Sequence, residues 1–369
     1  MTYQHLASPF TAGALKLSNC IVMPPMVQWI APPDAAVTPP SVAHYACVKG
    51  PGLVIVEATT VSPEGRLSAD QLGIYEDRHI DGLRTLAEVI HSNGAQAAIQ
   101  IHHAGRNTRT KTSFFGNPLV APSSLNDEGA EVPQELTHEG IQRIIACFAA
   151  AARRAMEAGF DAVELHAAHG YLFSQFLSPM SNHRADRWGG SLENRARFLM
   201  ETLAGVRKAT ARRIPAWCRL GPVDGAAGGL TLDEGLEVAR WLKAEGTPLI
   251  HVSQGMGGLP ALAPPGSPWC DRVHLAARVR KAVDIPVICV GEIRRPEEAE
   301  QLLAEGLADL VAVGRGILAD PAWADKSLRG LTDSIHYCRN CKECHHFTDA
   351  RKCPARREAQ RQEAMRRAG

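Results

Sequence analysis

Two histidines and a tyrosine follow an apolar segment of the chain at short intervals. His166, His169 and Tyr171 lie at and just beyond the end of the run "DAVELHAAHG" (161–170). Imidazole groups can donate hydrogen bonds to an oxygen atom that gains negative charge, and a tyrosine can supply a proton. Such histidines are often buried structural residues. Their position where an apolar strand ends favours a catalytic site instead.

Other polar side chains and glycines stand at the ends of further apolar segments. Gln100 lies near the end of one segment and Arg219 near the end of another. Gly291, Gly314 and Arg315 end two later segments, where glycine lets backbone amides approach a phosphate and arginine can add a forked hydrogen bond. Together these residues predict a site with a phosphate-binding loop, a cation and an amide beside the two histidines.

Eight short apolar segments alternate with helical patterns and are typical of buried parallel strands. They cover residues 21–26, 53–61, 96–105, 161–170, 215–221, 249–255, 286–291 and 309–316. Thr137 and Ser191 are expected to be N-caps of two intervening helices. The alternation predicts a (β/α)8 TIM barrel over residues 1–335, with an open doubly wound sheet as the alternative, and a cysteine-rich tail over 336–369. Active sites of such barrels lie at the C-terminal strand ends, which would bring the polar residues together.

The bulk composition is that of an ordinary globular protein. The 369 residues are 45% hydrophobic and 21% charged, with a net charge of +1. Without a basic bias, nucleic acid is not expected as a partner. No apolar run approaches the roughly 20 residues of a membrane span, and the N-terminus lacks the basic and apolar regions of a signal peptide. We therefore expect a cytoplasmic protein that does not enter the membrane.

The polar segment "DRWGGSLENR" (186–195) has a structural interpretation. Arg187, Glu193 and Arg195 predict a network of ion pairs that fixes the loop. Gly189 and Gly190 predict a turn.

Several segments carry highly specific motifs, above all "DAVELHAAHGYLFSQFLSP" and "SNHRADRWGGSLENRARF", together with "NCIVMPPM", "GLVIVEATTVSPEGR", "IQIHHAGR" and "DLVAVGRGILADP". Through them the chain resembles the old yellow enzyme family of FMN-dependent ene reductases, especially its bacterial branch and the related dienoyl-CoA reductase-like proteins. The resemblance implies FMN at the barrel mouth, NAD(P)H as the reductant and a small enone, nitroalkene or similar electrophilic alkene as the substrate. Hydride would pass from flavin N5 to the β-carbon, and Tyr171 would protonate the α-carbon.

The resemblance also implies a role for each residue of the site. His166 and His169 would bind the carbonyl or nitro oxygen of the substrate, and His166 would also contact the flavin. Gln100 would bind the pyrimidine edge of the flavin, and Arg219 would lie near N1, where a cation stabilises the reduced form. Further contacts would come from Pro25, Met26 and Ala58 on the isoalloxazine ring and from Gly291, Gly314 and Arg315 on the phosphate.

Two positions depart from the family pattern. Val27 stands beside the flavin where the family often has cysteine or threonine, and its side chain cannot form the hydrogen bond that tunes the flavin potential. Trp29 stands where the bacterial branch usually has a substrate-facing tyrosine. We expect both changes to affect redox potential and substrate preference rather than flavin binding. The arginine that bacterial relatives often extend into a neighbouring subunit is not found, so a homo-oligomer is left open but not implied.

Four closely spaced cysteines stand near the C-terminus. Cys338, Cys341 and Cys344 form a C-x2-C-x2-C run, and Cys353 follows. Four thiolates at this spacing suit a [4Fe–4S] cluster or a zinc site, for which the histidines at 345–346 are further candidate ligands. The run resembles one that follows the barrel in dienoyl-CoA reductases and trimethylamine dehydrogenase. A cluster here would pass electrons from a ferredoxin-like partner to FMN.

Three other functions are left open. An FMN-dependent amine dehydrogenase or demethylase is disfavoured by His166, His169 and Tyr171, because a cationic amine prefers aromatic or acidic surroundings. A metal-binding protein on an inactive barrel would be colourless. A dihydrouridine-synthase-like enzyme acting on RNA is disfavoured by the near-neutral charge. Neither the physiological alkene nor the choice between NADH and NADPH is encoded in a recognisable motif.

Overall fold

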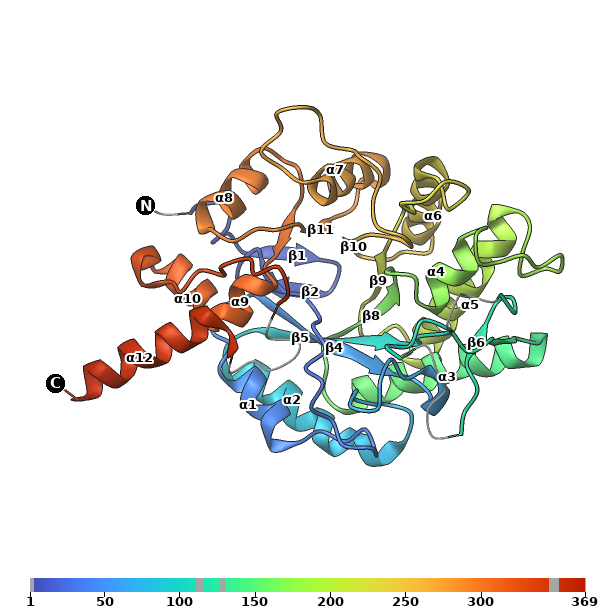
Figure 1. The fold of residues 1–369 in the computed structure, drawn as a ribbon, viewed down its shortest axis with the longest axis horizontal. Helices are drawn as coiled ribbons and strands as arrows, with labels where there is room; N and C mark the ends of the chain where they lie inside the picture. The colour runs from blue at the N-terminus through green and yellow to red at the C-terminus, as the bar shows by residue number, and fades with distance from the viewer. Residues whose placement is uncertain (1–2, 111–115, 126–129, 345–351, 369) are drawn as a thin grey trace.

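A computed structural model of the protein describes residues 3–110, 116–125, 130–344 and 352–368. Its centre is a closed barrel of eight parallel strands, which confirms the predicted TIM barrel (Figure 1). Each strand coincides with one predicted apolar segment. In barrel order the strands are β3 (Ile21–Met23), β4 (Leu53–Thr60), β5 (Gln96–His102), β8 (Ala162–Ala167), β9 (Ala216–Leu220), β10 (Ile250–Val252), β11 (Val287–Val290) and β12 (Leu310–Ala312).

Helices surround the barrel and bury the outer faces of its strands (Figure 1). The side chain of Thr137 accepts a hydrogen bond from the backbone N–H of Gly140 (3.1 Å), and Ser191 caps its helix in the same way, as predicted. The helices are α1 (Pro39–Ala46), α2 (Ile80–Ser92), α3 (His138–Glu157), α4 (Leu172–Leu177), α5 (Leu192–Ala209), α6 (Leu232–Ala244), α7 (Asp271–Val283), α8 (Pro296–Ala304), α9 (Arg315–Ala319) and α10 (Trp323–Leu328).

A short N-terminal hairpin closes one end of the barrel. Its strands, β1 (Phe10–Ala12) and β2 (Leu15–Leu17), pair antiparallel. Ala12, Leu15 and Leu17 belong to one buried apolar cluster with Ala162 and Leu310, which are the first residues of their strands. The N-terminal end of the barrel is therefore covered. The remaining short elements are β6 (Val120–Ala121), β7 (Gln134–Glu135), and the 3-10 turns η1 (Pro63–Gly65), η2 (Asp77–His79) and η3 (Thr332–Ser334).

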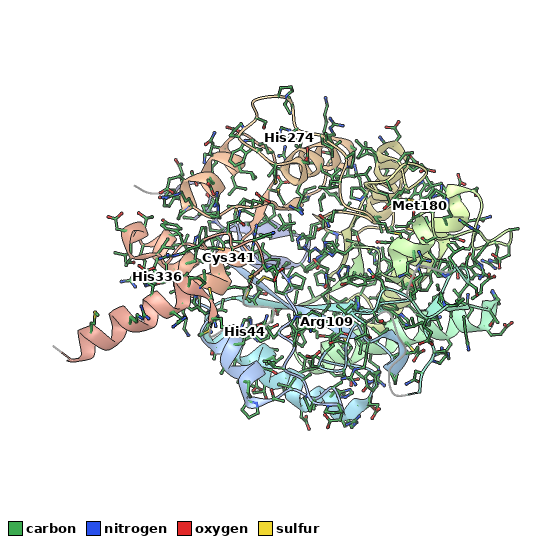
Figure 2. The ribbon with its side chains drawn as sticks, viewed as in Figure 1. His44, Arg109, Met180, His274, His336 and Cys341 are labelled. Atoms are coloured by element: carbon green, nitrogen blue, oxygen red, sulfur yellow. The ribbon has the colours of Figure 1, made fainter. Side chains whose placement is uncertain are left out.

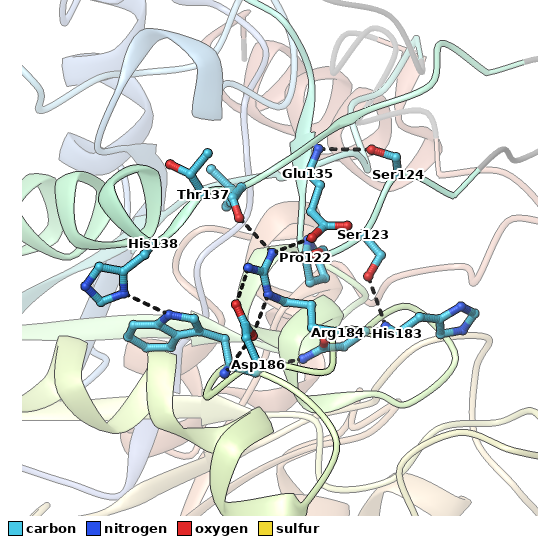
Figure 3. Close-up of polar contacts among 12 residues, drawn as sticks. Pro122, Ser123, Ser124, Glu135, Thr137, His138, His183, Arg184 and Asp186 are labelled. Carbon is cyan, nitrogen blue, oxygen red and sulfur yellow. Dashed lines mark hydrogen bonds and ion pairs between the residues drawn. The ribbon is translucent and has the colours of Figure 1, made fainter.

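Arg184 is the centre of the polar network in the loop that follows α4 (Figure 3). Its guanidinium donates hydrogen bonds to the carbonyl oxygens of Pro122 (3.0 Å) and Leu136 (2.7 Å) and to the carboxylate of Asp186 (2.5 Å). Pro122 directly follows β6 and Leu136 directly follows β7. Arg184 thus ties this strand pair to the loop.

The predicted network of Arg187, Glu193 and Arg195 was wrong in its partners. Arg187 pairs with Glu201 (2.9 Å), and Arg195 pairs with Glu234 (2.5 Å). No ion pair of Glu193 is present among the described residues. The partner of Arg195 lies at the start of α6, in the next strand–helix unit, so spacing within the loop could not reveal it.

The chain passes through α9 and α10 after the last strand and ends in α12 (Pro354–Ala368), which extends away from the barrel (Figure 1). The start of α12 is anchored, because Ala355 is buried and the Nε atom of Arg356 donates to the carbonyl oxygen of Leu318 (2.6 Å). The division of the chain between residues 335 and 336 stays a prediction. None of the helices described here is both long and apolar enough to cross a membrane.

Candidate active site

Four neighbouring strands present polar side chains to the barrel interior near their C-terminal ends. Side chains two residues apart in a strand face the same side, so each strand contributes a deeper residue and one nearer the mouth. These pairs, with the deeper residue first, are Gln100 and His102 on β5, Glu164 and His166 on β8, Trp217 and Arg219 on β9, and His251 and Ser253 on and after β10. All eight residues are buried.

A cavity of about 520 Å³ opens at the mouth level, and its volume is in the range of cofactor and small-molecule sites. Its lining combines predicted residues with others that the sequence did not single out. The predicted residues in the lining are Pro25, Met26, His169, Arg219, Gly291, Gly314 and Arg315. Strand ends distant in sequence therefore meet at one site, as the barrel prediction required.

The predicted histidines are in direct contact beside this cavity. The Nε2 atom of His166 lies 3.2 Å from the Nδ1 atom of His169, whose Nε2 atom lies 2.7 Å from the hydroxyl of Ser253. The φ angle of His169 is +61°, which turns the chain at the strand end. Burial lowers the pKa of both histidines well below the usual range. Both imidazoles are therefore neutral near pH 7.

Tyr171 packs against the edge of this histidine pair. The centre of its ring lies 4.8 Å from that of His166 and 4.5 Å from that of His102. Burial raises the pKa of Tyr171 to about 12, although the charge of Arg219 opposes the shift. The phenol therefore keeps its proton over the physiological range and can act only as a donor of that proton.

Positive charge gathers around the cavity. Arg219, Arg272, Arg294 and Arg315 line it, with Glu292 as the acidic residue of the lining. The Nε atom of Arg219 is buried and has no hydrogen-bond partner among the residues that the structure describes. An anion with several acceptor atoms would satisfy these donors.

Two predicted glycines stand where an added side chain would crowd neighbouring atoms. A Cβ atom at position 291 would lie 2.9 Å from the Sγ atom of Cys270, and one at position 314 would lie 3.2 Å from the Sδ atom of Met26. Glycine at position 291 lets this part of the wall pack closely against the start of α7, and glycine at position 314 keeps a side chain out of the space beside Met26. The arginine donors of the cavity fit the phosphate of FMN, and the wall beside these glycines fits its flat ring.

Six predicted contacts do not line this cavity. Two of them, His166 and Tyr171, lie next to His169, which does line it. Ala58 and Gln100 are buried within β4 and β5, and Val27 is half-buried after β3. The Trp29 ring lies under the guanidinium of Arg109, at 4.7 Å from the ring centre. The roles of these six residues stay predictions.

The sequence reasoning missed Glu164, His251 and Ser253. The signal was available for the first two, because each interrupts a strongly apolar strand with a group that is costly to bury unpaired. Glu164 accepts hydrogen bonds from Gln100, Trp217 and His251, which connects the missed residues to a predicted one.

The four C-terminal cysteines are half-buried. In the described part of the chain, no three His, Cys, Asp or Glu side chains converge into a group that could hold a metal ion. The histidines at 345–346 lie outside the described residues. The guanidinium of Arg315 at the cavity donates a hydrogen bond to Asn340, and Cys341, labelled in Figure 2, is the next residue in the chain. The cysteine run therefore begins next to the cavity.

Comparison with known proteins agrees with this geometry. A model of the NADH:flavin oxidoreductase / NADH oxidase family matches residues 5–334. An NADH oxidase of Thermoanaerobacter brockii is 42% identical over 348 residues, which are 92% of this chain and 53% of that protein. An NADPH dehydrogenase of Listeria monocytogenes serotype 4b is 40% identical over 334 residues, 89% of this chain and 96% of that protein.

The solved structure of 2-naphthoyl-CoA reductase with 2-naphthoyl-CoA superimposes with a TM-score of 0.86 at 29% identity, over 94% of this chain and 56% of that chain. This chain thus spans about half the length of the NADH oxidase and of the reductase, and nearly all of the NADPH dehydrogenase. The family match and the 40% identity over nearly the whole NADPH dehydrogenase show that this chain belongs to the NADH:flavin oxidoreductase, or old yellow enzyme, family.

Proposed function

We propose that this protein is an FMN-dependent ene reductase that uses NAD(P)H to reduce the activated C=C bonds of small enones, nitroalkenes or similar compounds. Membership of the family implies FMN and NAD(P)H. The observation that carries the proposal is the cluster of His166, His169 and Tyr171, of which His169 lines a positively charged cavity. When bound, FMN would supply a hydride taken from NAD(P)H to the β-carbon of the alkene.

The cavity residues would hold FMN by its charged and flat parts. Arg219 would stabilise negative charge at the N1 side of the ring, and Gln100 would bind the pyrimidine edge. The remaining contacts would be made on the ring by Pro25, Met26, Val27, Ala58 and His166, and on the phosphate by Gly291, Gly314 and Arg315.

His166 and His169 would bind the oxygen of the substrate. As hydride reaches the β-carbon, negative charge moves onto the carbonyl or nitro oxygen, and neutral imidazole donors stabilise it without a change of protonation. Burial strengthens these hydrogen bonds, because little water competes for them. Trp29 would contact the far part of the substrate from the segment after β3.

Tyr171 would complete the reaction by protonating the α-carbon. Its raised pKa keeps the proton on the phenol until a strongly basic carbon develops beside it. After transfer, the charge of Arg219 would stabilise the phenolate, since Arg219 already lowers the pKa of Tyr171 relative to burial alone.

An amine dehydrogenase is a weaker interpretation of the same site. Four arginines and one glutamate line the cavity, so a cationic amine would be repelled by its lining. An enone or nitroalkene carries a partial negative charge on oxygen and gains more during the reaction.

The C-terminal cysteines would hold a [4Fe–4S] cluster, with zinc as the alternative metal, once their side chains, which do not converge in the part of the chain that the structure describes, are brought together. Cys338, Cys341, Cys344 and Cys353 supply four thiolates, and the contact of Asn340 with Arg315 would keep the cluster close to the flavin phosphate. A ferredoxin-like protein would then be an additional electron donor.

An anaerobic titration tests the proposed function. The purified protein, loaded with FMN, is reduced with NADPH and then mixed with 2-cyclohexenone while the flavin absorbance is followed. Bleaching by NADPH and recovery with the enone support the ene-reductase cycle. Bleaching without recovery on either an enone or a nitroalkene would overturn the proposed substrate class. Failure to bind FMN would overturn the whole proposal.

A further inference from the structure

A carboxylate lies in the barrel interior at the level below the cavity. Glu164 is fully buried, and its two oxygen atoms accept three hydrogen bonds from side chains of three other strands. Its Oε1 atom accepts from the Nε2 atom of Gln100 (2.8 Å). Its Oε2 atom accepts from the Nε1 atom of Trp217 (2.7 Å) and the Nδ1 atom of His251 (2.8 Å).

Glu164 is ionised in this environment. Burial raises the pKa of the carboxyl group, but the hydrogen bonds from His251 and Trp217 and the charge of Arg219 outweigh this effect and lower the pKa. Burial lowers the pKa of His251, which is therefore neutral and donates through Nδ1. An ionised carboxylate has no proton to give, so Glu164 can only accept hydrogen bonds.

The ionised carboxylate of Glu164 fixes the orientation of the Gln100 side-chain amide. The two ends of a glutamine amide are easily interchanged when neighbours can both donate and accept. Beside Glu164, the NH2 end must face the carboxylate, and the carbonyl oxygen must face away from it. Among the described residues, no donor contacts the Oε1 atom of Gln100, and this atom is not among the buried atoms without a partner. The Oε1 atom of Gln100 is therefore the acceptor that this side chain would offer to a ligand.

We propose that Glu164 is a positioning residue that determines which edge of the cofactor the site accepts. By holding the oxygen of Gln100 outward, it selects a ring edge that carries an N–H donor, as N3–H of the isoalloxazine does. The inference rests on the proposed function, which places Gln100 at that edge. Trp217 strengthens the argument, because its indole can only donate and so requires an acceptor at position 164.

Glu164→Gln would reverse the amide of Gln100. The single oxygen of the introduced amide must face Trp217, so the introduced NH2 group faces Gln100, which then turns its own oxygen toward position 164. The NH2 group of Gln100 would oppose the N3–H of FMN, donor against donor. The double variant Glu164→Gln with Gln100→Glu keeps the charge and the shape. It restores an acceptor, because a carboxylate at position 100 can bind the introduced amide with one oxygen and FMN with the other.

The test compares FMN affinity in the full-length apoproteins by quenching of flavin fluorescence. We expect Glu164→Gln to weaken FMN binding by about 10- to 100-fold, as for an unpaired buried donor, and the double variant to recover most of the loss. The thermal unfolding of each apoprotein is measured in parallel. A merely structural Glu164 would give a double variant that binds no better than the single one, and this result would overturn the inference.

A second measurement needs no variant. Wild-type apoprotein is titrated with 3-methyl-FMN, which lacks the N3–H donor. We expect at least about 10-fold weaker binding than that of FMN, and equal binding would overturn the inference even if Glu164→Gln failed to fold. If FMN binds and the variants behave like the wild type, only the positioning role fails. If wild-type protein does not bind FMN, the proposed function fails and the inference falls with it.

Discussion

The Nε2 atom of His166 lies 3.2 Å from the Nδ1 atom of His169, so the two groups proposed to bind the substrate oxygen are hydrogen-bonded to each other. The backbone N–H of Ala168 points to the Nδ1 atom of His166 (3.4 Å), which places the His166 proton on Nε2. His169 then accepts through Nδ1 and donates through Nε2 to Ser253. For both rings to donate to a substrate oxygen, that oxygen must replace the contact between the rings and also the contact of His169 Nε2 with Ser253.

His169→Ala should slow the reoxidation of the reduced enzyme by 2-cyclohexenone by about 100-fold, because one donor to the developing oxyanion is lost. Stopped-flow absorbance of the flavin measures this rate. Reoxidation of the same variant by dioxygen is the control, since that reaction needs no donor to a carbonyl oxygen. An equal loss with both oxidants would indicate a disturbed flavin site rather than a lost substrate contact.

Tyr171→Phe should slow the same reaction by about 100-fold, because the α-carbon loses its proton donor while the packing against His166 is kept. Reduction by NADPH, measured separately, should change little. A Phe variant as fast as the wild type would remove Tyr171 from the mechanism.

In the wild type, the rate of reoxidation by 2-cyclohexenone should be nearly constant between about pH 6 and pH 9. The reason is that burial lowers the pKa of His166 and His169 and raises that of Tyr171 to about 12.

The barrel was predictable because its signals are local. Each strand is a continuous apolar run, and the helices between them begin at residues such as Thr137 and Ser191 that cap through their own side chains. The histidine pair was predictable from the rule that barrel sites lie at strand ends. The site could thus be located from the sequence once the strands were counted.

The interior of the site was not predictable in the same way. Every residue of β8 is buried, so the sequence does not reveal that Glu164 faces inward or that His251, two strands away, meets it across the barrel. That contact exists only once the barrel closes. The ion pair of Arg195 with Glu234 was missed for the same reason, because it joins side chains of different strand–helix units.

His102→Leu should make the protein less sensitive to acid. Burial, with a smaller effect of His103, lowers the pKa of His102 to about 3, and neither ring nitrogen has a hydrogen-bond partner in the described part of the chain. The unfolded chain, with a histidine pKa near 6.5, binds this proton first. Stability is therefore unaffected above that pH and falls as the pH drops from about 6.5 toward 3.

Urea unfolding at pH 7 and pH 5 measures this difference. His102 alone should account for about 2 kcal/mol of the loss of unfolding free energy between these pH values. The Leu variant should lack that part and keep the part due to His103, whose pKa burial lowers to about 4. If the wild type and the Leu variant lose the same unfolding free energy between pH 7 and pH 5, His102 does not take up a proton on unfolding.

Gly291→Ala should weaken FMN binding by about 10-fold, because the added methyl group would lie 2.9 Å from Cys270 Sγ and 3.1 Å from Val273 Cγ2 and must displace one of them. The double variant with Cys270→Ala removes the closer contact and should recover part of the affinity. Cys270→Ala alone is the control, since the side chain of Cys270 makes no capping hydrogen bond at the start of α7. Unchanged binding by Gly291→Ala would show that the wall is not tight there.

Cys341→Ser should abolish metal binding at the C-terminal run without removing FMN, because none of the four thiols lines the cavity. After anaerobic reconstitution with iron and sulfide, the wild type should carry about four iron atoms per chain. If zinc is the natural metal, the protein should instead bind one zinc ion per chain. Cys147→Ser, on α3, is the matched control and should keep the full metal content. A Cys341 variant with wild-type metal content would exclude the run as the ligand set, and wild-type protein that takes up neither metal would refute the proposed site. Loss of both metal and FMN in the Cys341 variant would instead mean that the contact of Asn340 with Arg315 makes the two sites depend on each other.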